Sequence, residues 1–587
     1  MKLKKYKKSG VTVGVLFSKM RNEWNRNLAQ GIKDTAFENG VNVIQYCNGG
    51  LQHKNSESSQ FNIIGELIDT DKLDALIINN SAFGPHLKDH DCEVFCRKFT
   101  SIPIILLNKQ LGSFFNISYD DCESVVIAAR HLVEVHQYYN IALMRRSVSS
   151  NYQLQLKAFR NTLNSLNIPV NNKFIINDIP RENQNAELLA VLYKLMENGA
   201  EAIIAGETVA RQVIYVLTNA GVKIPSEIAV LGLNNQISSE FTVPPLSSIE
   251  RSFYKLGRLA VEKIISLLNG KSLEKNIKLN PFLVRRSSCG CFNQPVHEIT
   301  ESISGENIST RKGEFLDIKN EITEKMREII GHTREDLEFT DNLLKAYADD
   351  LKNPGEYIFL NFLQKILKKN INIYISPNVL QKILTLLINM SLPFLKSREK
   401  LIHMQFTWQQ ARLFINDYSL HNQSMTIFQN RIHYEDYRLF SQKLLSTFEL
   451  KELLEVMVKE LSGNRIPFAY LVLYENPKPY KYPGPIPRWS RLVMAYTENG
   501  RIEINEAGLH FQTKHFLPDN IWQNYFIALK NNYFCIVESL AIEGQQLGYM
   551  VLGLSGKLTA VSYWLKNVVS ISLQGALNYK QLHAQSK

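Results

Sequence analysis

Residues 222–249 read VKIPSEIAVLGLNNQISSEFTVPPLSSI. Within this stretch, an apolar run from Ile228 to Leu233 passes directly into the polar tripeptide 234–236. A short run rich in β-branched residues that ends in small polar residues is typical of a parallel strand buried on both faces. Ligands of parallel sheets bind just beyond the carboxyl ends of the strands. The stretch therefore predicts a central strand and one wall of a binding site.

Strand and helix patterns alternate around this stretch. The other expected strands are Val11–Phe17, Val41–Tyr46, Ala75–Ile78, Ile104–Leu107, Ile141–Met144, Phe174–Ile176 and Ala202–Ala205. Helical patterns separate most of them, at 18–40, 61–68, 125–135, 152–166, 186–196 and 209–220. This alternation predicts an α/β fold with a parallel sheet covered by helices. The span is too long for one sheet, so we expect two lobes.

Residues 222–249 also resemble the sensor domain of LacI/GalR-type regulators, which carry a close variant of I-P-x-D-I-A-V-x-G-F-D-D…P-P-L-T-T-I. Four further stretches resemble the same family: VGVLFSKMRNEWNRNLAQGI, HLVEVHQYYNIALM, AIIAGETVA and LVRRSSCGC, the last as its terminal strand. The resemblance covers residues 10–291. It implies a two-lobed, periplasmic-binding-protein-like type I fold with a ligand in the cleft between the lobes. It also implies chain crossovers near residues 108, 235 and 280.

Candidate ligand-binding residues follow the ends of the expected strands. Trp24 and Asn25 stand where the family places aromatic stacking residues, and an aromatic face suits a sugar ring. Amide, hydroxyl, carboxylate and guanidinium groups that converge in a cleft can bind hydroxyl groups. The full set is Asn22, Trp24, Asn25, Asn80, Ser81, Asp120, Arg145, Gln155, Glu207 and Asn234. Each of these residues is also compatible with a strand-end cap or a solvated loop.

Three departures from the family set this chain apart. Gln155 stands where the resemblance implies a sugar-gripping arginine, 234–235 is Asn-Asn in place of Asp-Asp, and 206–207 is Gly-Glu in place of Asn-Asp. A standard monosaccharide is therefore not assumed as the ligand. The first strand begins at Val11, so we expect no N-terminal helix-turn-helix, and the family's repressor mechanism does not carry over in that form.

Composition narrows the class of protein. The chain has 587 residues, a net charge of +11 and 45% hydrophobic residues, which indicates several soluble domains. Five lysines within residues 1–9 form a basic tail, either solvated or in contact with phosphates. We expect neither a membrane span nor a signal peptide, and hence a cytoplasmic location. The seven cysteines are scattered without zinc spacing, so we expect reduced thiols, no metal and no cofactor.

The second half of the chain has a different pattern. Residues 292–312 are polar and predict a linker, and residues 313–445 are predominantly helical. The segment 414–445 has apolar residues at near-heptad spacing, which fits a bundle helix or a dimeric coiled coil. Residues 446–587 have the helix, antiparallel sheet, helix order of a GAF-like domain. Their proline-rich segment 476–491 is expected to be a surface loop.

Catalytic motifs are missing from the sequence, which has no P-loop, His-Glu-x-x-His or Gly-x-Ser-x-Gly. We therefore expect a signal-sensing regulator and not an enzyme. It would bind a small sugar-like ligand, act as a homodimer and pass its signal to C-terminal regions or a partner protein. Two alternatives stay open: a transcriptional regulator that binds DNA through its helical region, and a scaffold without ligand.

Overall fold

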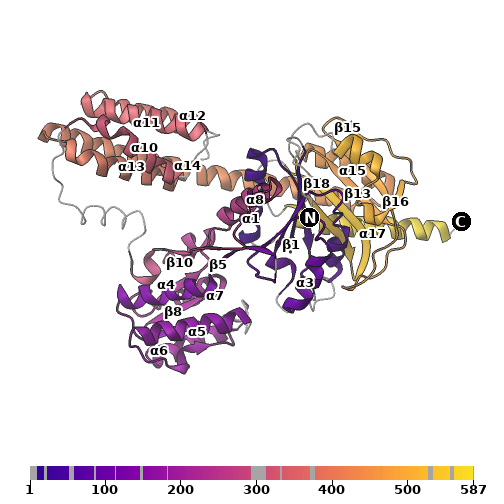
Figure 1. The fold of residues 1–587 in the computed structure, drawn as a ribbon, viewed down its shortest axis with the longest axis horizontal. Coiled ribbons are helices and arrows are strands. Elements are labelled where there is room, and N and C mark those ends of the chain that lie inside the picture. Colours follow the sequence, from indigo (N-terminus) through magenta and orange to yellow (C-terminus); the bar gives the residue numbers. More distant parts are fainter. Residues whose placement is uncertain are drawn as a thin grey trace. The chain divides into compact units, whose positions relative to one another are not determined.

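The structure is a computed structural model that describes residues 10–585 except 19–22, 52–58, 85–86, 113, 146–149, 181–182, 292–312, 331–333, 354, 370–376, 465, 527–532 and 555–560. The expected basic tail and linker lie outside the described residues. The chain forms two compact units (Figure 1). One joins the first 284 residues to residues 437–587, and the other holds the helical middle of the chain.

The first lobe is built on a parallel sheet in the order β11-β5-β4-β3-β1-β2. Its strands are β1 (Thr12–Ser18), β2 (Asn42–Asn48), β3 (Ala75–Asn79), β4 (Ile104–Leu107), β5 (Phe115–Tyr119) and β11 (Asn276–Leu279). The helices α1 (Glu23–Glu38) and α8 (Phe253–Leu268) pack against each other and cover one face. The other face is covered by η1 (Phe61–Leu67) and α3 (Asp89–Arg97), with Phe95 in the core.

The second lobe has its own sheet, in the order β12-β10-β9-β8-β6-β7. Its strands are β6 (Ile141–Met144), β7 (Ile175–Ile176), β8 (Ala202–Gly206), β9 (Ala229–Leu233), β10 (Ser247–Glu250) and β12 (Phe282–Val284). Its helices are α4 (Asp121–Glu134), α5 (Ser150–Ser165), α6 (Asn185–Glu197) and α7 (Glu207–Asn219). The stretch quoted at the outset thus supplies β9 and β10, which pair in parallel at the centre of this sheet.

The crossovers between the lobes differ from those expected. The chain leaves the first sheet after Tyr119 and the second sheet after Glu250, so the positions near 108 and 235 are wrong. The third crossover lies between Leu279 and Phe282, near the expected residue 280. The first error has a local cause, because Phe-Asn-Ile-Ser-Tyr in β5 lacks an apolar run. The terminal strand also stops at Val284, earlier than expected.

The helical unit consists of α10 (Lys319–Ile330), α11 (Arg334–Lys352), α12 (Ile358–Lys369), α13 (Pro377–Ser391) and part of the 48-residue helix α14 (Arg398–Leu445). These helices share a core at whose centre Tyr347 is fully buried. The hydroxyl of Tyr347 lies 2.9 Å from Ser391 Oγ and accepts a hydrogen bond from the indole N–H of Trp408. Among the described residues, no helix is long and apolar enough to span a bilayer.

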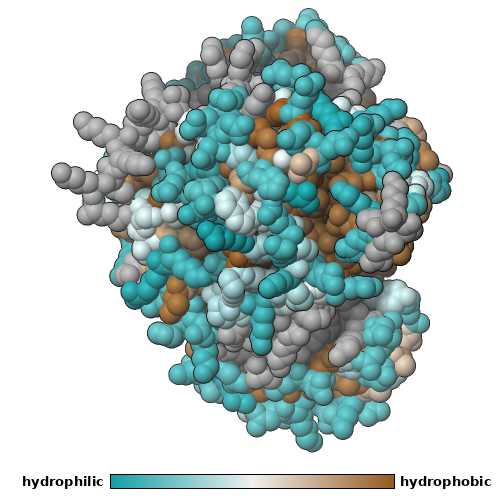
Figure 2. Space-filling model, turned by 90° about the vertical axis from the view of Figure 1, so that its right-hand side faces the viewer, coloured by the Kyte–Doolittle hydropathy of each residue, from teal (hydrophilic) through white to brown (hydrophobic). Residues whose placement is uncertain are grey.

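The C-terminal domain is an antiparallel sheet with helices on one face. It contains α15 (Leu450–Gly463), β13 (Ala469–Tyr474), β14 (Trp489–Thr497), β15 (Gly500–Arg501), β16 (Leu509–Gln512), β17 (Phe534–Ile542), β18 (Gln545–Gly553) and α17 (Val561–Gln585). Apolar side chains of α15 and α17 form one core with β13 and β18. Figure 2 views the molecule from the side of this domain, where apolar residues show as brown areas among hydrophilic ones.

The first lobe and the C-terminal domain share one continuous sheet. β17 pairs in parallel with β2, from Phe534 opposite Val43 to Glu538 opposite Cys47, and so extends the first-lobe sheet to twelve strands. Both strands are almost entirely buried, as a parallel pair covered on both faces requires. The pairing also covers the edge of β2, which would otherwise expose unpaired backbone groups.

Side chains reinforce this seam between β2 and β17. Gln60, just before η1, donates to the carbonyl of Tyr480 and accepts from its N–H group, at 3.0 and 2.7 Å. Gln546 of β18 donates to the carbonyl of Gln60. Tyr480 and the ring of Tyr482, which contacts Phe95, belong to the proline-rich segment. The segment is a largely exposed loop, as its composition predicts, and these two tyrosines hold it against the first lobe.

Candidate functional site

A small, open hollow lies between the two lobes of the sensor region. Its first wall is the start of α1, and its second wall is formed by the residues that follow β9 and β10. The lining residues are Glu23, Trp24, Asn27, Asn234, Asn235, Gln236, Glu250, Arg251, Ser252, Phe253 and Tyr254. One hydrogen bond crosses between the walls, because the N–H of Ile237 donates to Glu23 Oε1 over 2.7 Å.

Aromatic rings gather on one side of this hollow. The centroids of Trp24 and Phe253 lie 6.4 Å apart, and those of Tyr119 and Phe253 are separated by the same distance. The guanidinium carbon of Arg251 lies 5.8 Å from the ring centroid of Phe253. Aromatic faces beside charged and amide groups suit a small ligand that has both an apolar side and hydroxyl groups.

The backbone after β9 is shaped by two asparagines. Asn234 has a φ of 122° and Asn235 a φ of 39°, both in the region that disfavours most side chains and that asparagine tolerates. Asn235 Nδ2 donates to Glu250 Oε2 over 2.6 Å, which ties the exit of β9 to the exit of β10. The two asparagines therefore have two roles: they allow the backbone to turn after β9, and they present side-chain amides to the hollow.

Charged side chains link the three crossovers. Arg251, at the second crossover, donates both to the carboxylate of Asp121, at the first, and to the side-chain oxygen of Asn234. Lys278, near the third crossover, donates to Asp120 Oδ2 over 3.1 Å. All three connections between the lobes are thus tied to one another beside the hollow. Any change in the angle between the lobes must rearrange these contacts.

Two of these charged groups have shifted pKa values. Burial alone would raise the pKa of Asp120, but hydrogen bonds from the N–H groups of Glu123 and Cys122 and from Lys278 outweigh it and lower that pKa. The N–H bonds arise because Asp120 caps the N-terminus of α4. Burial lowers the pKa of Arg145, a neighbour of Asp121 and Arg251, while the charge of Asp121 opposes this shift.

The predicted site residues divide into those at the hollow and those engaged elsewhere. Trp24 and Asn234 line it, Asp120 belongs to the charged links, and Arg145 neighbours those links. Asn25 is buried and accepts from Asn79 Nδ2, which also donates to Ser81 Oγ. Asn80 follows β3 in the same turn, partly exposed. Asn22 lies outside the described residues.

Glu207 and Gln155 have structural partners in the second lobe. The carboxylate of Glu207 is buried and accepts hydrogen bonds from the hydroxyls of Ser239 and Ser248 and from the N–H of Gln236. These bonds connect the start of α7 to the exits of β9 and β10. Gln155 is buried on α5 and donates to the backbone carbonyl of Asp121 over 3.3 Å. Neither side chain lines the hollow.

Sequence reasoning missed Glu23, Glu250, Arg251 and Phe253 at the hollow. Glu250 ends β10 and the last two follow it, and the strand's sequence Ser-Ser-Ile-Glu has no apolar run long enough to mark it. Had β10 been recognised, the rule that ligands bind beyond the carboxyl ends of parallel strands would have pointed to Arg251. The pairing of Arg251 with Asp121, 130 positions away, has no local signal in the sequence.

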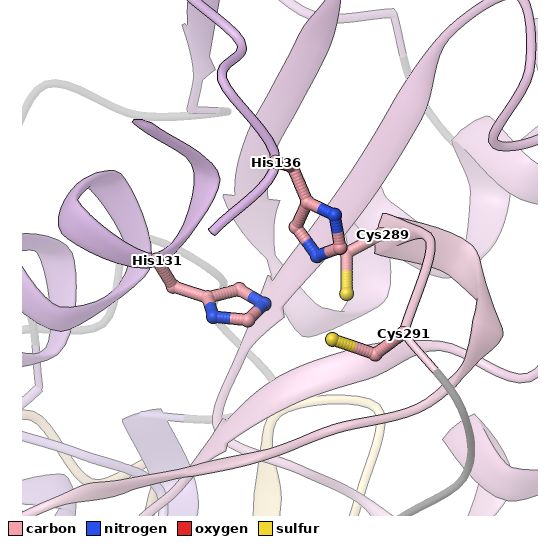
Figure 3. A group of neighbouring side chains, drawn as sticks. All are labelled: His131, His136, Cys289 and Cys291. Carbon is pink, nitrogen blue, oxygen red and sulfur yellow. The ribbon is translucent and has the colours of Figure 1, made fainter. Parts of the chain in front are cut away.

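A second group of side chains lies at the far end of α4. His131, His136, Cys289 and Cys291 converge there (Figure 3). The nitrogen and sulfur atoms that can act as ligands lie within 4.8 Å of one another. The sequence predicted no metal, because it has no Cys-x-x-Cys pair and no grouping of cysteines with histidines at zinc spacing. In the structure, the pair of histidines and the pair of cysteines lie together although they are far apart in the sequence.

Comparison with known proteins agrees with this two-lobed architecture. A family model described as periplasmic binding protein-like domain matches residues 129–289, so the chain contains a domain of this class. The repressor PurR of Photobacterium profundum is 25% identical over 288 residues, which cover 48% of this chain and 82% of PurR. Catabolite control protein A of Priestia megaterium is 20% identical over 275 residues, 46% of this chain and 79% of that protein. These matches, which cover about 48% of the chain in the case of PurR, are consistent with a LacI-type sensor domain.

A similar solved structure is that of the lac repressor dimer bound to operator and the anti-inducer ONPF. It has a TM-score of 0.41 and 20% identity, and the match covers 48% of this chain and 94% of that one. The regulator CcpA of Lactococcus lactis gives a TM-score of 0.40 at 18% identity, over 48% and 99% of the two chains. Several of the curated relatives, PurR among them, are named as HTH-type transcriptional repressors or regulators.

Proposed function

We propose that this chain is a ligand-responsive regulator of transcription. It binds a small, sugar-like molecule in the hollow between the lobes and passes lobe closure to its C-terminal domain. The observation that carries the proposal is the hollow itself, where an aromatic side and a ring of amide and charged groups face each other across the two lobes. The names of curated relatives such as the transcriptional repressor PurR and the transcriptional regulator DegA support regulation of transcription.

The shared sheet suggests how closure is transmitted. Because β17 continues the first-lobe sheet, the C-terminal domain moves with the first lobe as one body. Ligand binding then swings the second lobe against this combined body and rearranges the links around Arg251. In this proposal the signal is a change in the position of the second lobe, read by the GAF-like domain, the helical region or a partner protein.

A thermal-shift panel tests the proposed ligand class. Monosaccharides, polyols and nucleosides are added to the full chain, and a ligand that occupies the hollow raises the melting temperature. Replacing Trp24 with alanine is expected to weaken binding of that ligand about 3–10-fold, because an aromatic contact is lost. The replacement Trp489→Ala, at an exposed tryptophan of β14, leaves the affinity unchanged. A flat response across the panel would favour the scaffold alternative.

The long helix α14 supports a homodimer. Phe406, Leu413 and Leu420 recur every seven residues, and their side chains are 58%, 62% and 63% exposed. The opposite side of the helix, with Met404, Ala411 and Ile415, is buried in the core of the helical unit. A solvent-facing apolar stripe at heptad spacing suits pairing with the same helix of a second copy. We therefore assign the dimer contact to this stripe.

The replacement Leu413→Glu with Leu420→Glu is expected to convert the dimer to monomers, because it places charges in the paired stripe. Sedimentation equilibrium of the full chain measures the mass. Leu401→Glu, at an exposed leucine of the same helix outside the stripe, keeps the dimer. An unaltered chain that sediments as a monomer, or a dimer that persists in the double variant, contradicts the assignment.

DNA binding through the helical region is the second candidate, since the curated relatives include HTH-type repressors. The apolar face of α13, with Leu380, Ile383, Leu384 and Leu387, is buried in the helical core. That face is not available to a DNA groove, which weighs against α13 as the reading helix. A gel shift with the DNA upstream of the gene, repeated over a range of salt concentrations, tests whether the chain binds DNA. No retardation at low salt excludes this candidate.

A further inference from the structure

We propose that His131, His136, Cys289 and Cys291 bind a structural zinc ion in the second lobe (Figure 3). Two imidazole nitrogens and two thiolate sulfurs are a donor set that fills the four positions of tetrahedral zinc. The four ligand atoms already lie within 4.8 Å of one another. The inference does not depend on the proposed ligand or on the proposed output of the protein.

The two histidines are brought together by the way α4 ends. His131 lies in the last turn of the helix and is buried. Gln137 then adopts a φ of 59°, and the N–H groups of Gln137 and Tyr138 donate to carbonyls of the preceding turn. This left-handed reversal is a common way to close a helix. It folds His136 back toward His131, and the two ring centroids lie 4.9 Å apart at an angle of 86°.

The two cysteines are positioned by a tight turn around a glycine. Gly290 has a φ of 104°, which favours glycine, and its N–H donates to the carbonyl of Ser287 over 3.0 Å. Cys289 and Cys291 flank this glycine, and their sulfurs approach the histidines in Figure 3. Neither cysteine forms a disulfide in the structure, and cysteines separated by a single residue form one poorly. The Cys-Gly-Cys turn thus presents two sulfurs from one short segment.

The donor set favours one metal over the others. Thiolate and imidazole ligands suit zinc, whereas magnesium and calcium prefer oxygen ligands, which this group lacks. With four protein ligands, the coordination sphere is closed and no position is left for a reacting water, so the site is structural and not catalytic. Partial exposure of His136 and Cys291 leaves the ion a route from solvent.

Zinc at this position ties the two ends of the matched domain together. His131 stands near its beginning at residue 129, and Cys289 is its last matched residue. The bound ion would fix the turn at 287–291 to the end of α4. It would thereby set the point at which the chain leaves the second lobe. In the absence of zinc, we expect this terminal turn to detach from α4 more readily, because metal binding contributes directly to folding.

Metal analysis of the full chain tests the site. Protein produced with zinc and dialysed against a weak chelator is expected to retain about one zinc per chain, as a closed four-ligand site should. The double variant Cys289→Ser with Cys291→Ser is expected to lose it. The control Cys122→Ser removes a half-buried thiol outside the group and keeps the metal. A metal-free unaltered chain, or equal zinc content in the double variant, overturns the proposal.

Cobalt substitution gives a second readout that does not depend on how well a variant folds. Replacing zinc by Co²⁺ in the unaltered chain is expected to produce the near-ultraviolet charge-transfer absorption of cobalt–thiolate bonds and the intense visible bands of tetrahedral cobalt. A spectrum typical of octahedral cobalt with oxygen ligands would instead overturn the assignment of these four residues. A strong chelator should lower the melting temperature of the unaltered chain and leave that of the cysteine double variant unchanged.

Discussion

Replacing Lys566 with methionine is expected to lower the free energy of unfolding by about 3–5 kcal/mol, because it leaves a buried carboxylate without its partner. Lys566 of α17 and Glu538 of β17 form an ion pair over 3.2 Å, with side chains only 3% and 1% exposed. The ammonium group also lies 3.8 Å from the ring centroid of Phe61 in the first lobe. The pair therefore stands where the C-terminal domain meets the first lobe.

Two matched variants separate the charge effect from a general effect of the substitution. Lys580→Met changes an exposed lysine of the same helix and should alter stability by no more than about 0.5 kcal/mol. The double variant Lys566→Met with Glu538→Leu removes both charges and should recover most of the loss, because an apolar pair no longer carries an unpaired charge. Urea titrations followed by circular dichroism compare the transition midpoints. A Lys566→Met midpoint equal to that of the unaltered chain would contradict the prediction.

The fold of the sensor region was predictable where strands carry their own signal. The run Ile228–Leu233 is apolar and bounded by a proline and two asparagines, and the structure places β9 there, at Ala229–Leu233. β5 alternates apolar and polar residues over only five positions, and β10 has a single apolar residue among four, so periodicity did not mark either strand. Those two missed strands account for the misplaced crossovers, since each crossover directly follows one of them.

The candidate ligand site was predictable only in part, because some of its residues follow strands that the sequence does not mark. Trp24 and Asn234 were found because one matches the family pattern and the other follows a recognised strand. Arg251 follows a strand that was not recognised. Glu207 carries the expected carboxylate, but the hydroxyls of Ser239 and Ser248 occupy it, and such partners depend on tertiary contacts.

Contacts between distant parts of the chain gave no signal at all. The pairing of β2 with β17 joins residues almost 500 positions apart, and each strand alone resembles any other buried strand. The same holds for the group in Figure 3, where His-x4-His and Cys-x-Cys are each unremarkable and acquire meaning only when the fold unites them. Sequence patterns report a local environment, whereas both features are properties of the assembled fold.

The replacement Gly257→Ala is expected to destabilise the first lobe by about 2–3 kcal/mol, although alanine is the better helix former. A Cβ at Gly257 of α8 would lie 2.2 Å from the backbone carbonyl oxygen of Leu28 in α1. Gly31 faces α8 in the same way, 2.1 Å from the carbonyl oxygen of Tyr254. The two helices therefore pack backbone to backbone. Neither carbonyl oxygen can move aside as the end of a flexible side chain would.

Gly575→Ala is the matched control, because it makes the same change in the helix α17, where a Cβ would meet no atom within 4 Å. There the higher helix propensity of alanine acts alone and should raise stability by about 0.5–1 kcal/mol. Opposite signs in urea titrations of the two variants are thus the expected result. Gly257→Ala should also weaken ligand binding in the hollow. Trp24 lies at the start of α1 and Phe253 at the start of α8, so moving the two helices apart also moves these two aromatic rings apart. A stabilised Gly257→Ala variant would show that α1 and α8 are not held in this close contact.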